Sequence, residues 1–313
     1  MSFTDQVKHE VSRLESNNKM CQLAELSALI MMNGSIQIIN KNLAVKVRLY
    51  HGDLARKVYK LIKERFELNI EIMVRRRNHF STYQNIYDLF LPPQPGIEVF
   101  LKKVGVLDED HNLLFRIKKE LVTSKSCQKS YVRGAFLGGG SVNNPRGEYH
   151  LEFRCEHESF AEDLLMLLKR FGLEGHLTEH RKKYVVYFKS FSEVATILNI
   201  IGAHKALLKL EDNKVLKEVK NGVNRRVNCE TANLDKTVKA AMLQLEDIEL
   251  IEKTRGLETL SNSLQEIAII RKKYPYASLK ELGKLLDPPL SKSGVNHRLR
   301  RIKSIANEIR GER

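Results

Sequence analysis

The sequence lacks any long uncharged apolar run. A helix that crosses a bilayer needs roughly 18 to 20 such residues, whereas the longest apolar stretch, residues 26–39, contains Asn33 and Gly34. The N-terminal segment MSFTDQVKHEVSR is polar from its start and has no apolar core of the kind that signal peptides carry. We therefore expect a cytoplasmic protein without a membrane partner.

Cysteine and proline are also scarce. Cys21, Cys127, Cys155 and Cys229 lie far apart and form no C-x-x-C motif, so their spacing indicates neither a zinc site nor a disulfide framework. We expect buried thiols, no metal and no cofactor. Seven prolines and 42% hydrophobic residues are typical of a folded, globular chain.

Acidic residues are in deficit. The chain has 38 Asp and Glu against 53 Lys and Arg, which gives a net charge of +15 and a pI near 9.6. Such an excess favours a polyanionic partner, such as nucleic acid or an acidic membrane surface. A length of 313 residues predicts more than one domain.

An internal repeat organises the first part of the chain. The segment CQLAELSALIMMNGSI begins at Cys21, and CQKSYVRGAFLGGGSV begins at Cys127, at an offset of 106 residues. This offset also pairs Ala28 with Gly134 and continues through the segments that follow. Gly105 matches Gly202 after a shortened loop. Roughly the first 203 residues are thus two copies of one unit.

Each copy is predicted to be a helix, two strands, a helix, two strands and a helix. In the first copy these elements cover residues 21–32, 36–39, 43–50, 53–66, 70–74, 83–90 and 97–104. Ala28 and Gly134 are small enough for the first helices of the two copies to approach closely. We expect these helices to meet at a pseudo-two-fold axis.

This αββαββα unit, with its small residues and its helix that ends in Gly-Ser, resembles the LAGLIDADG homing-endonuclease fold. The resemblance covers LSALIMMNG (26–34) and VRGAFLGGG (132–140). In that family an acid precedes the final glycine of the helix, and the two acids bind the metal ions used for cleavage. Asn33 and Gly139 occupy these positions here, so we expect the nuclease chemistry to be absent. The alternative is a metal-dependent nuclease with displaced acids, for which Glu25 and Asp163 are the nearby candidates.

One face of the sheets offers a possible DNA-binding surface. In the strand 43–50, apolar residues alternate with a face that carries Lys46 and Arg48. The run Arg75, Arg76 and Arg77 and the corresponding position Arg154 in the second copy complete this possible DNA-facing sheet. A solvated loop would explain the arginine run equally well.

The C-terminal part is predicted to be helical, with helices at 234–253, 262–273, 278–286 and 291–309. Ser278 and Glu281 form a capping box, and Pro288 and Pro289 stop the third helix. A turn of about four residues then separates the last two helices, which is the spacing of a helix-turn-helix.

The last helix has the composition of a DNA-reading helix. Its apolar stripe is Val295, Leu299, Ile302 and Ile305, and residues 291–313 contain seven Lys or Arg against two Glu. Lys292 and Asn296 are expected to reach bases, with His297 replacing Asn296 if the helix starts at Ser293. Arg300 and Arg301 are expected to contact phosphate. The full set of expected helix-turn-helix site residues is Ser278, Lys280, Ser291, Lys292, Ser293, Asn296, His297, Arg298, Arg300, Arg301 and Lys303.

Taken over its whole length, the chain is similar to the WhiA family of bacterial regulators. The segments NGVNRRVNCETANLDKTVKAA and LSKSGVNHRLRRI carry this resemblance most specifically. It implies an α+β protein with LAGLIDADG-like repeats at 1–110 and 111–220 and an all-α domain at 221–313, whose helix-turn-helix covers about 278–309.

The resemblance also implies a function. It implies a non-enzymatic, nucleoid-associated regulator that binds double-stranded DNA and controls transcription, with roles in sporulation or in cell division and chromosome segregation in Gram-positive bacteria. RNA polymerase or another transcription factor is a possible partner. The remaining alternative is an architectural nucleoid protein, since a basic chain binds DNA whatever its sequence.

Overall fold

The computed structural model describes residues 2–79 and 82–311, without the side chains of residues 77–84. The chain forms two compact units, Met1–Lys217 and Glu218–Arg313. No helix in the described ranges is both long and apolar enough to cross a membrane.

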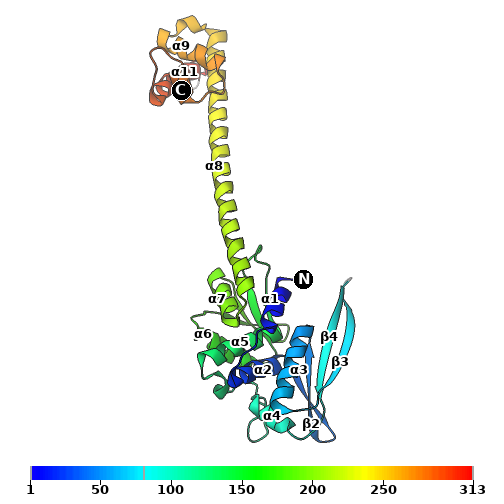
Figure 1. Cartoon of the computed structure of the whole chain (residues 1–313). Helices are drawn as coiled ribbons and strands as arrows, with labels where there is room; N and C mark the ends of the chain where they lie inside the picture. Colours follow the sequence, from blue (N-terminus) through cyan, green and yellow to red (C-terminus); the bar gives the residue numbers. More distant parts are fainter. Residues whose placement is uncertain (1, 80–81, 312–313) are drawn as a thin grey trace. The chain divides into compact units, whose positions relative to one another are not determined.

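The first repeat occupies the first half of the N-terminal unit (Figure 1). After α1 (Phe3–Ser12), its elements are α2 (Lys19–Asn33), β1 (Gly34–Ile39), β2 (Asn42–Leu49), α3 (Gly52–Phe66), β3 (Glu71–His79), β4 (Thr82–Leu91) and α4 (Ile97–Lys103). The strands form an antiparallel sheet in the order β1-β2-β4-β3. The αββαββα order expected from the sequence is confirmed.

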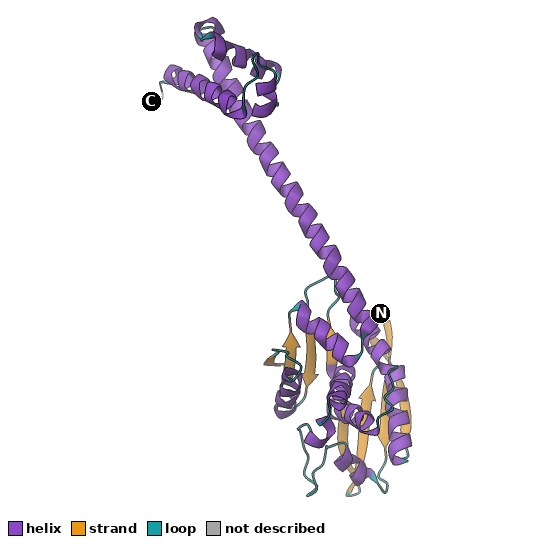
Figure 2. Ribbon diagram, turned by 60° about the vertical axis from the view of Figure 1, so that its left-hand side comes forward, coloured by secondary structure: helices purple, strands orange, loops and turns teal. Residues whose placement is uncertain are grey.

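The second repeat has the same architecture. After a 3-10 turn, η1 (Lys119–Val122), it consists of α5 (Lys125–Gly139), β5 (Gly140–Val142), β6 (Leu151–Cys155), α6 (Glu158–Lys169), β7 (His176–His180), β8 (Lys183–Phe188) and α7 (Phe191–Ile201). Its sheet order, β5-β6-β8-β7, matches that of the first sheet. Helices of both repeats pack against the sheets (Figure 2) and share one apolar core.

A single long helix, α8 (His204–Thr254), follows the repeats. The expected helix start at Leu234 is therefore wrong, and the expected boundary at 220/221 falls inside a helix. One Gly in a helix interior costs only about 1 kcal/mol, and no proline interrupts 204–254. In the N-terminal unit, Lys209, Lys214 and Lys217 of α8 lie over the rings of Phe3, Phe191 and Tyr149.

The C-terminal unit adds η2 (Leu257–Thr259), α9 (Asn262–Lys273), α10 (Leu279–Lys284) and α11 (Lys292–Arg310) to the end of α8. Its core includes Ile248, Ile267, Leu282 and Leu299. The third expected helix ends at Lys284 instead of Leu286, so the turn before α11 covers residues 285–291 and is longer than expected. The amide of Leu290 donates to the carbonyl of Gly283 at 2.8 Å, which closes this turn against α10.

Candidate nucleic-acid interface

Helix α11 docks through one apolar stripe. The buried residues of this stripe are Val295, Leu299, Ile302 and Ala306. The sequence predicted Ile305 as the last residue of the stripe, but Ile305 is only half-buried, and Ala306 is buried in its place. The helix begins after Ser291, whose Oγ accepts from the amide of Gly294 at 3.2 Å. The capping and the stripe together fix which face of α11 meets solvent.

The face opposite the stripe is polar and basic. At 100° per residue, Ser293, His297 and Arg300 point away from the buried stripe, and all three side chains are exposed. Arg301 is exposed beside them. Within the described residues, neither Arg300 nor Arg301 forms a hydrogen bond or ion pair, so both guanidinium groups are available to an anion.

The remaining expected residues of the helix-turn-helix fall into three groups. Lys280, Lys292 and Lys303 are exposed, whereas Asn296 lies on the flank of α11 and is half-buried. Ser278 and Ser291 act as N-caps, with Ser278 in the expected capping box. Each of these two hydroxyl groups is therefore engaged inside the protein.

Arg298 is also engaged inside the protein. Its Nη1 donates to Glu266 Oε2 and to the carbonyl of Ser263, each at 3.1 Å. Glu266 Oε1 in turn accepts from the amide of Asp287 in the turn before α11, at 3.3 Å. Arg298 therefore ties α11 to α9 in this structure and does not face solvent with the other arginines.

Sequence reasoning missed Arg271, which is the largest fully buried side chain of the molecule's described part. Its Nη1 donates to the carbonyl of Ala277 at 2.6 Å and lies 3.4 Å from that of Pro275. Burial lowers the pKa of Arg271. The side chain holds the loop between α9 and α10 in place, and its position in a run with Lys272 and Lys273 gave no signal of this role.

The first sheet uses its basic residues differently. Lys46, Arg48 and Arg75 all form ion pairs with Asp88, at 3.4 Å for Lys46 and 2.8 Å for Arg48. Burial would raise the pKa of Asp88, but the hydrogen bonds from Arg48 and Arg75 outweigh it and hold the pKa far below its ordinary range. Asp88 was not among the expected site residues, although it lies directly opposite Arg48 in the register of β2 and β4.

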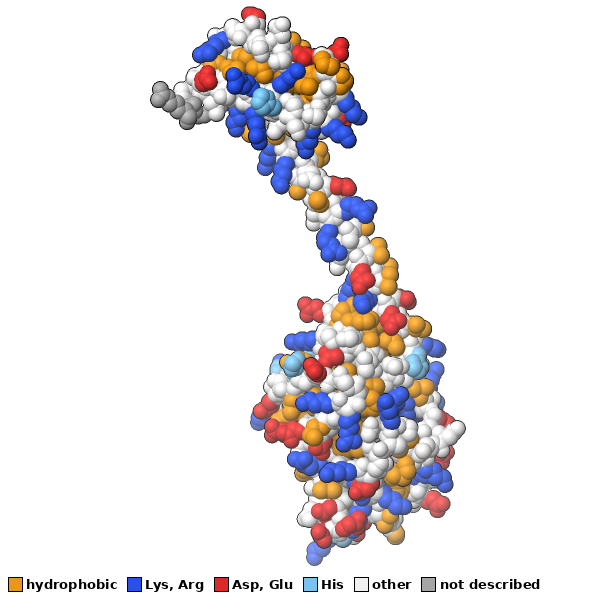
Figure 3. Space-filling view, turned by 90° about the vertical axis from the view of Figure 1, so that its left-hand side faces the viewer, with side chains coloured by type: hydrophobic (Ala, Val, Ile, Leu, Met, Phe, Trp, Pro, Cys, Tyr) orange, Lys and Arg blue, Asp and Glu red, His pale blue; other side chains and the backbone are white. Residues whose placement is uncertain are grey.

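The other expected sheet residues do not form one surface. Successive strand residues point to opposite faces, so Arg76 lies on the other face from Arg75, and the side chain of Arg77 is outside the described residues. In the second sheet, Arg154 Nε donates to Glu152 Oε1 at 2.7 Å. On the side drawn in Figure 3, basic side chains of the N-terminal unit are interspersed with acidic ones.

The ends of α2 and α5, where the fold's catalytic acids would stand, carry no carboxylate. Asn33 Nδ2 lies 3.4 Å from the carbonyl of Gly138. A Cβ added at Gly139 would lie 2.2 Å from Met32 Cε and 2.6 Å from the carbonyl oxygen of Arg154. Position 139 therefore has no room for an acid without rearrangement. Among the described residues, no group of three or more His, Cys, Asp and Glu could hold a metal ion.

The displaced acids considered above are engaged elsewhere. Glu25 is 2% exposed and lies between two cations, with Lys57 Nζ 2.5 Å from Oε1 and Arg133 Nη2 3.0 Å from Oε2. Asp163 accepts from the amide of Ile117 at 3.0 Å and pairs with Arg116 at 3.4 Å. Each carboxylate thus has a structural partner.

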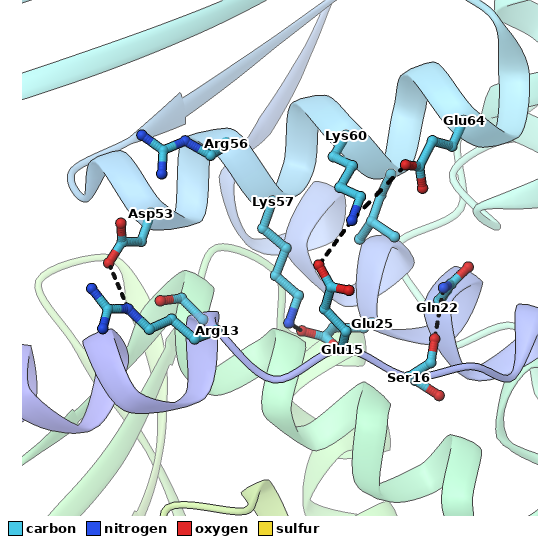
Figure 4. Close-up of a pocket in the computed structure, with 12 residues that line it drawn as sticks. Arg13, Glu15, Ser16, Gln22, Glu25, Asp53, Arg56, Lys57, Lys60 and Glu64 are labelled. Carbon is cyan, nitrogen blue, oxygen red and sulfur yellow. Dashed lines mark hydrogen bonds and ion pairs between the residues drawn. The ribbon is translucent and has the colours of Figure 1, made fainter.

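Glu25 also lines a cavity of about 390 Å³ whose other lining residues come from α1, α2, α3 and the segment between α1 and α2. Figure 4 shows how its charged side chains point at one another, with Lys57 directed at Glu25, Lys60 at Glu15 and Arg13 at Asp53. These pairs neutralise most of the charge that lines the cavity.

Three family models match the chain in succession. They are the WhiA N-terminal LAGLIDADG-like domain over residues 19–107, the WhiA LAGLIDADG-like domain over 128–220 and the WhiA C-terminal HTH domain over 223–306. This chain belongs to the WhiA family. The matches confirm both the expected fold and the family resemblance.

Relatives of known name or structure agree with this assignment. The chain is 43% identical to a WhiA-family protein of Clostridium botulinum, named "Probable cell division protein WhiA", over 99% of each chain. It is also similar to the full-length WhiA crystal structure from Thermotoga maritima, with 26% identity, a TM-score of 0.60 and coverage of 98% and 99%. The match of the family's HTH domain to residues 223–306 supports the conclusion that this chain is a DNA-binding protein.

Proposed function

We propose that this WhiA-family protein is a sequence-specific transcriptional regulator that reads double-stranded DNA with α11 and does not cleave it. The observation that carries the proposal is the exposed face of α11, where Arg300 and Arg301 have no partner among the described residues while Arg48 and Arg75 are both paired with Asp88. Unpaired cations gain most from phosphate contact, because no internal ion pair has to be broken.

Sequence reading is assigned to the N-terminal half of α11. A recognition helix inserts this half into the major groove, and its exposed residues there are Lys292, Ser293 and His297. His297 is better placed than Asn296, because it points away from the buried stripe while Asn296 is half-buried on the flank. Arg300, Arg301 and Lys303 then contact the phosphate backbone.

The test compares His297→Ala, Asn296→Ala and Arg301→Ala in the full-length protein. Each variant is titrated at several salt concentrations against a duplex selected for tight binding and a scrambled duplex of the same composition. His297→Ala should weaken binding to the selected duplex about 5- to 150-fold, which corresponds to about 1–3 kcal/mol, and spare the scrambled one. Equal affinity of the unaltered protein for both duplexes would replace this proposal by that of an architectural nucleoid protein.

The absence of cleavage rests on separate observations. Asn33 and the crowded Gly139 stand where the acids of the fold would be, and Glu25 is already neutralised by Lys57 and Arg133. Incubation of the purified protein with duplex DNA and Mg²⁺ or Mn²⁺ should therefore yield no strand breaks. Breaks that EDTA abolishes in separate preparations would contradict this part of the proposal.

The physiological role is part of the same proposal, and the name of a relative, "Probable cell division protein WhiA", supports it. We place the protein in the cytoplasm at the nucleoid, acting in cell division and chromosome segregation or in sporulation, with RNA polymerase or another transcription factor as its partner. Cells whose chromosomal copy carries His297→Ala should lose occupancy at the selected sites and show the division or sporulation defect of a deletion strain. A normal phenotype despite lost occupancy would separate DNA reading from that role.

A further inference from the structure

Cys21 and Cys127 face each other where the two repeats meet. They are the third residues of α2 and α5, and their Sγ atoms are 3.2 Å apart. Both side chains are buried, at 2% and 3% exposure. The repeat places the same residue type on both sides of the pseudo-two-fold axis, so the two thiols meet without any further element between them.

The surroundings of this pair make Cys21 the more acidic of the two thiols. Burial would raise the pKa of Cys21, but hydrogen bonds with Ser126, Cys127 and Ser130 outweigh it and lower the pKa. The pKa of Cys127 is raised, first by burial and then by its interaction with Cys21. Cys21 is thus the thiol that loses its proton more readily and attacks an oxidant first, and Cys127 is its partner in the second step.

We propose that Cys21 and Cys127 form a peroxide-responsive dithiol site whose oxidation links α2 to α5. In the first step the Cys21 thiolate attacks hydrogen peroxide, and after protonation one water leaves and Cys21 becomes a sulfenic acid. In the second step the Cys127 thiol attacks the Cys21 sulfur. The S–S bond forms as the S–O bond breaks, and the hydroxyl leaves as a second water with the proton of the Cys127 thiol. The pair loses two electrons, which the peroxide accepts.

The geometry allows a disulfide bond between Cys21 and Cys127 and favours a small oxidant. The sulfur atoms have to close from 3.2 Å to about 2.05 Å, which side-chain rotation can supply where the helix backbones already touch. A Cβ at Gly134 would lie only 2.3 Å from the carbonyl oxygen of Glu25, so the two helices cross at very close range. Because both thiols are buried, a small oxidant such as hydrogen peroxide should reach them more easily than a bulky disulfide reagent.

The other two cysteines serve as internal references. Burial raises the pKa of Cys155 to about 12, so its thiol stays protonated and unreactive. Cys229 is exposed and is expected to react first with any oxidant, without an intramolecular partner. A Cys229→Ser background removes this reaction and leaves the pair and Cys155 for comparison.

The test treats full-length Cys229→Ser protein with hydrogen peroxide. Thiols titrated after denaturation should fall from three to one, and mass spectrometry should find the Cys21 peptide joined to the Cys127 peptide. Because the bond closes a loop of about 100 residues in the unfolded chain, the Tm of the N-terminal unit should rise by about 5–15 °C and return after treatment with dithiothreitol.

Two controls decide the outcome. Cys127→Ala in the same background should lose the cross-link and the rise in Tm. The primary result does not depend on the folding of this variant, because it is measured on the Cys229→Ser protein, in which the pair is intact. Three free thiols after a treatment that oxidises Cys229 in the unaltered protein would overturn the proposal. Oxidation of Cys155 to the same extent as the pair would overturn it as well, because the reaction would then reflect unfolding.

Discussion

In the N-terminal unit Lys46, Arg48 and Arg75 converge on Asp88, and Lys57 and Arg133 converge on Glu25. In the C-terminal unit the exposed Arg300 and Arg301 have no acidic partner among the described residues. Comparable side chains therefore have different roles on the two surfaces. The five cations of the N-terminal unit form internal ion pairs, whereas Arg300 and Arg301 on α11 remain unpaired within the described residues. Arg298 of the same helix is an exception, because it is paired with Glu266.

This difference shows why net charge is a poor guide to the location of a binding surface. The chain as a whole carries a net charge of +15, yet three basic strand residues of the first sheet, Lys46, Arg48 and Arg75, are all paired with one buried carboxylate, Asp88. A paired arginine must give up its partner before it can contact phosphate, whereas an exposed one has only its hydration to lose. Four experiments can break or sharpen the comparison.

The largest effect is expected from Glu25→Gln. The variant leaves Lys57 and Arg133, whose side chains are only 10% and 12% exposed, without their anion. Removing one member of a buried ion pair costs about 3–5 kcal/mol. Urea denaturation of the full-length protein should show this loss in the transition of the N-terminal unit. Glu64→Gln on the same cavity wall is the control. Glu64 pairs with Lys60 at the surface, and the loss of this exposed pair should change stability by less than about 1 kcal/mol. Similar losses of unfolding free energy in the two variants would contradict the claim that Glu25 stabilises the fold more than an exposed carboxylate does.

The second experiment measures which cations meet DNA. In the Arg300→Ala/Arg301→Ala double variant, the slope of log K against log salt should flatten by about two units. Arg48→Ala should leave this slope unchanged, because its guanidinium is held by Asp88. A flatter slope for Arg48→Ala would show that the sheet also binds DNA, and the contrast between the two units would fail.

The third experiment tests Asp88 through its pH dependence. Its pKa in the folded protein is depressed, so its stabilising contribution is present above the unfolded value of about 3.9 and is lost as the pH falls below it. At pH 7 Asp88→Asn should lower the unfolding free energy by about 1–3 kcal/mol. The gap between the two proteins should narrow below about pH 4, and a gap that stayed constant down to pH 2 would contradict the ion-pair assignment.

The smallest effect concerns the support of α10. Ser278→Ala removes the capping hydroxyl and should destabilise the C-terminal unit by about 0.5–2 kcal/mol. Ser304→Ala on the exposed face of α11 is the matched control, and it should be neutral or slightly stabilising because alanine is the better helix former. Thermal unfolding followed by circular dichroism can compare the two, and equal midpoints would mean that the cap contributes nothing.

The repeat, the order of elements and the helix-turn-helix could be predicted from the sequence, because each depends on local periodicity and spacing. The 106-residue offset even identified the helices that meet at the axis. The long α8 was missed, since Gly222 and its neighbouring asparagines are typical of a connection but are tolerated in a helix whose other residues favour it.

Side-chain partners across the fold could not be predicted in the same way. Arg48 and Asp88 are 40 residues apart and meet through strand register, which periodicity alone does not specify. Arg271 lies in a basic run that favours an exposed surface, yet it is buried because the carbonyl of Ala277 accepts from it. Arg298 was assigned to DNA by composition, and its contact with Glu266 depends on how α9 packs against α11.

The ion pair between Glu25 and Arg133 has no counterpart at the equivalent positions of the two repeats. At the 106-residue offset Glu25 corresponds to Tyr131 and Arg133 to Ser27, two uncharged residues that also lie buried near each other at the axis. A symmetric homodimer would have to carry the same pairing twice. Two repeats within one chain can differ in sequence, and here a charged contact lies on one side of the axis and a neutral one on the other.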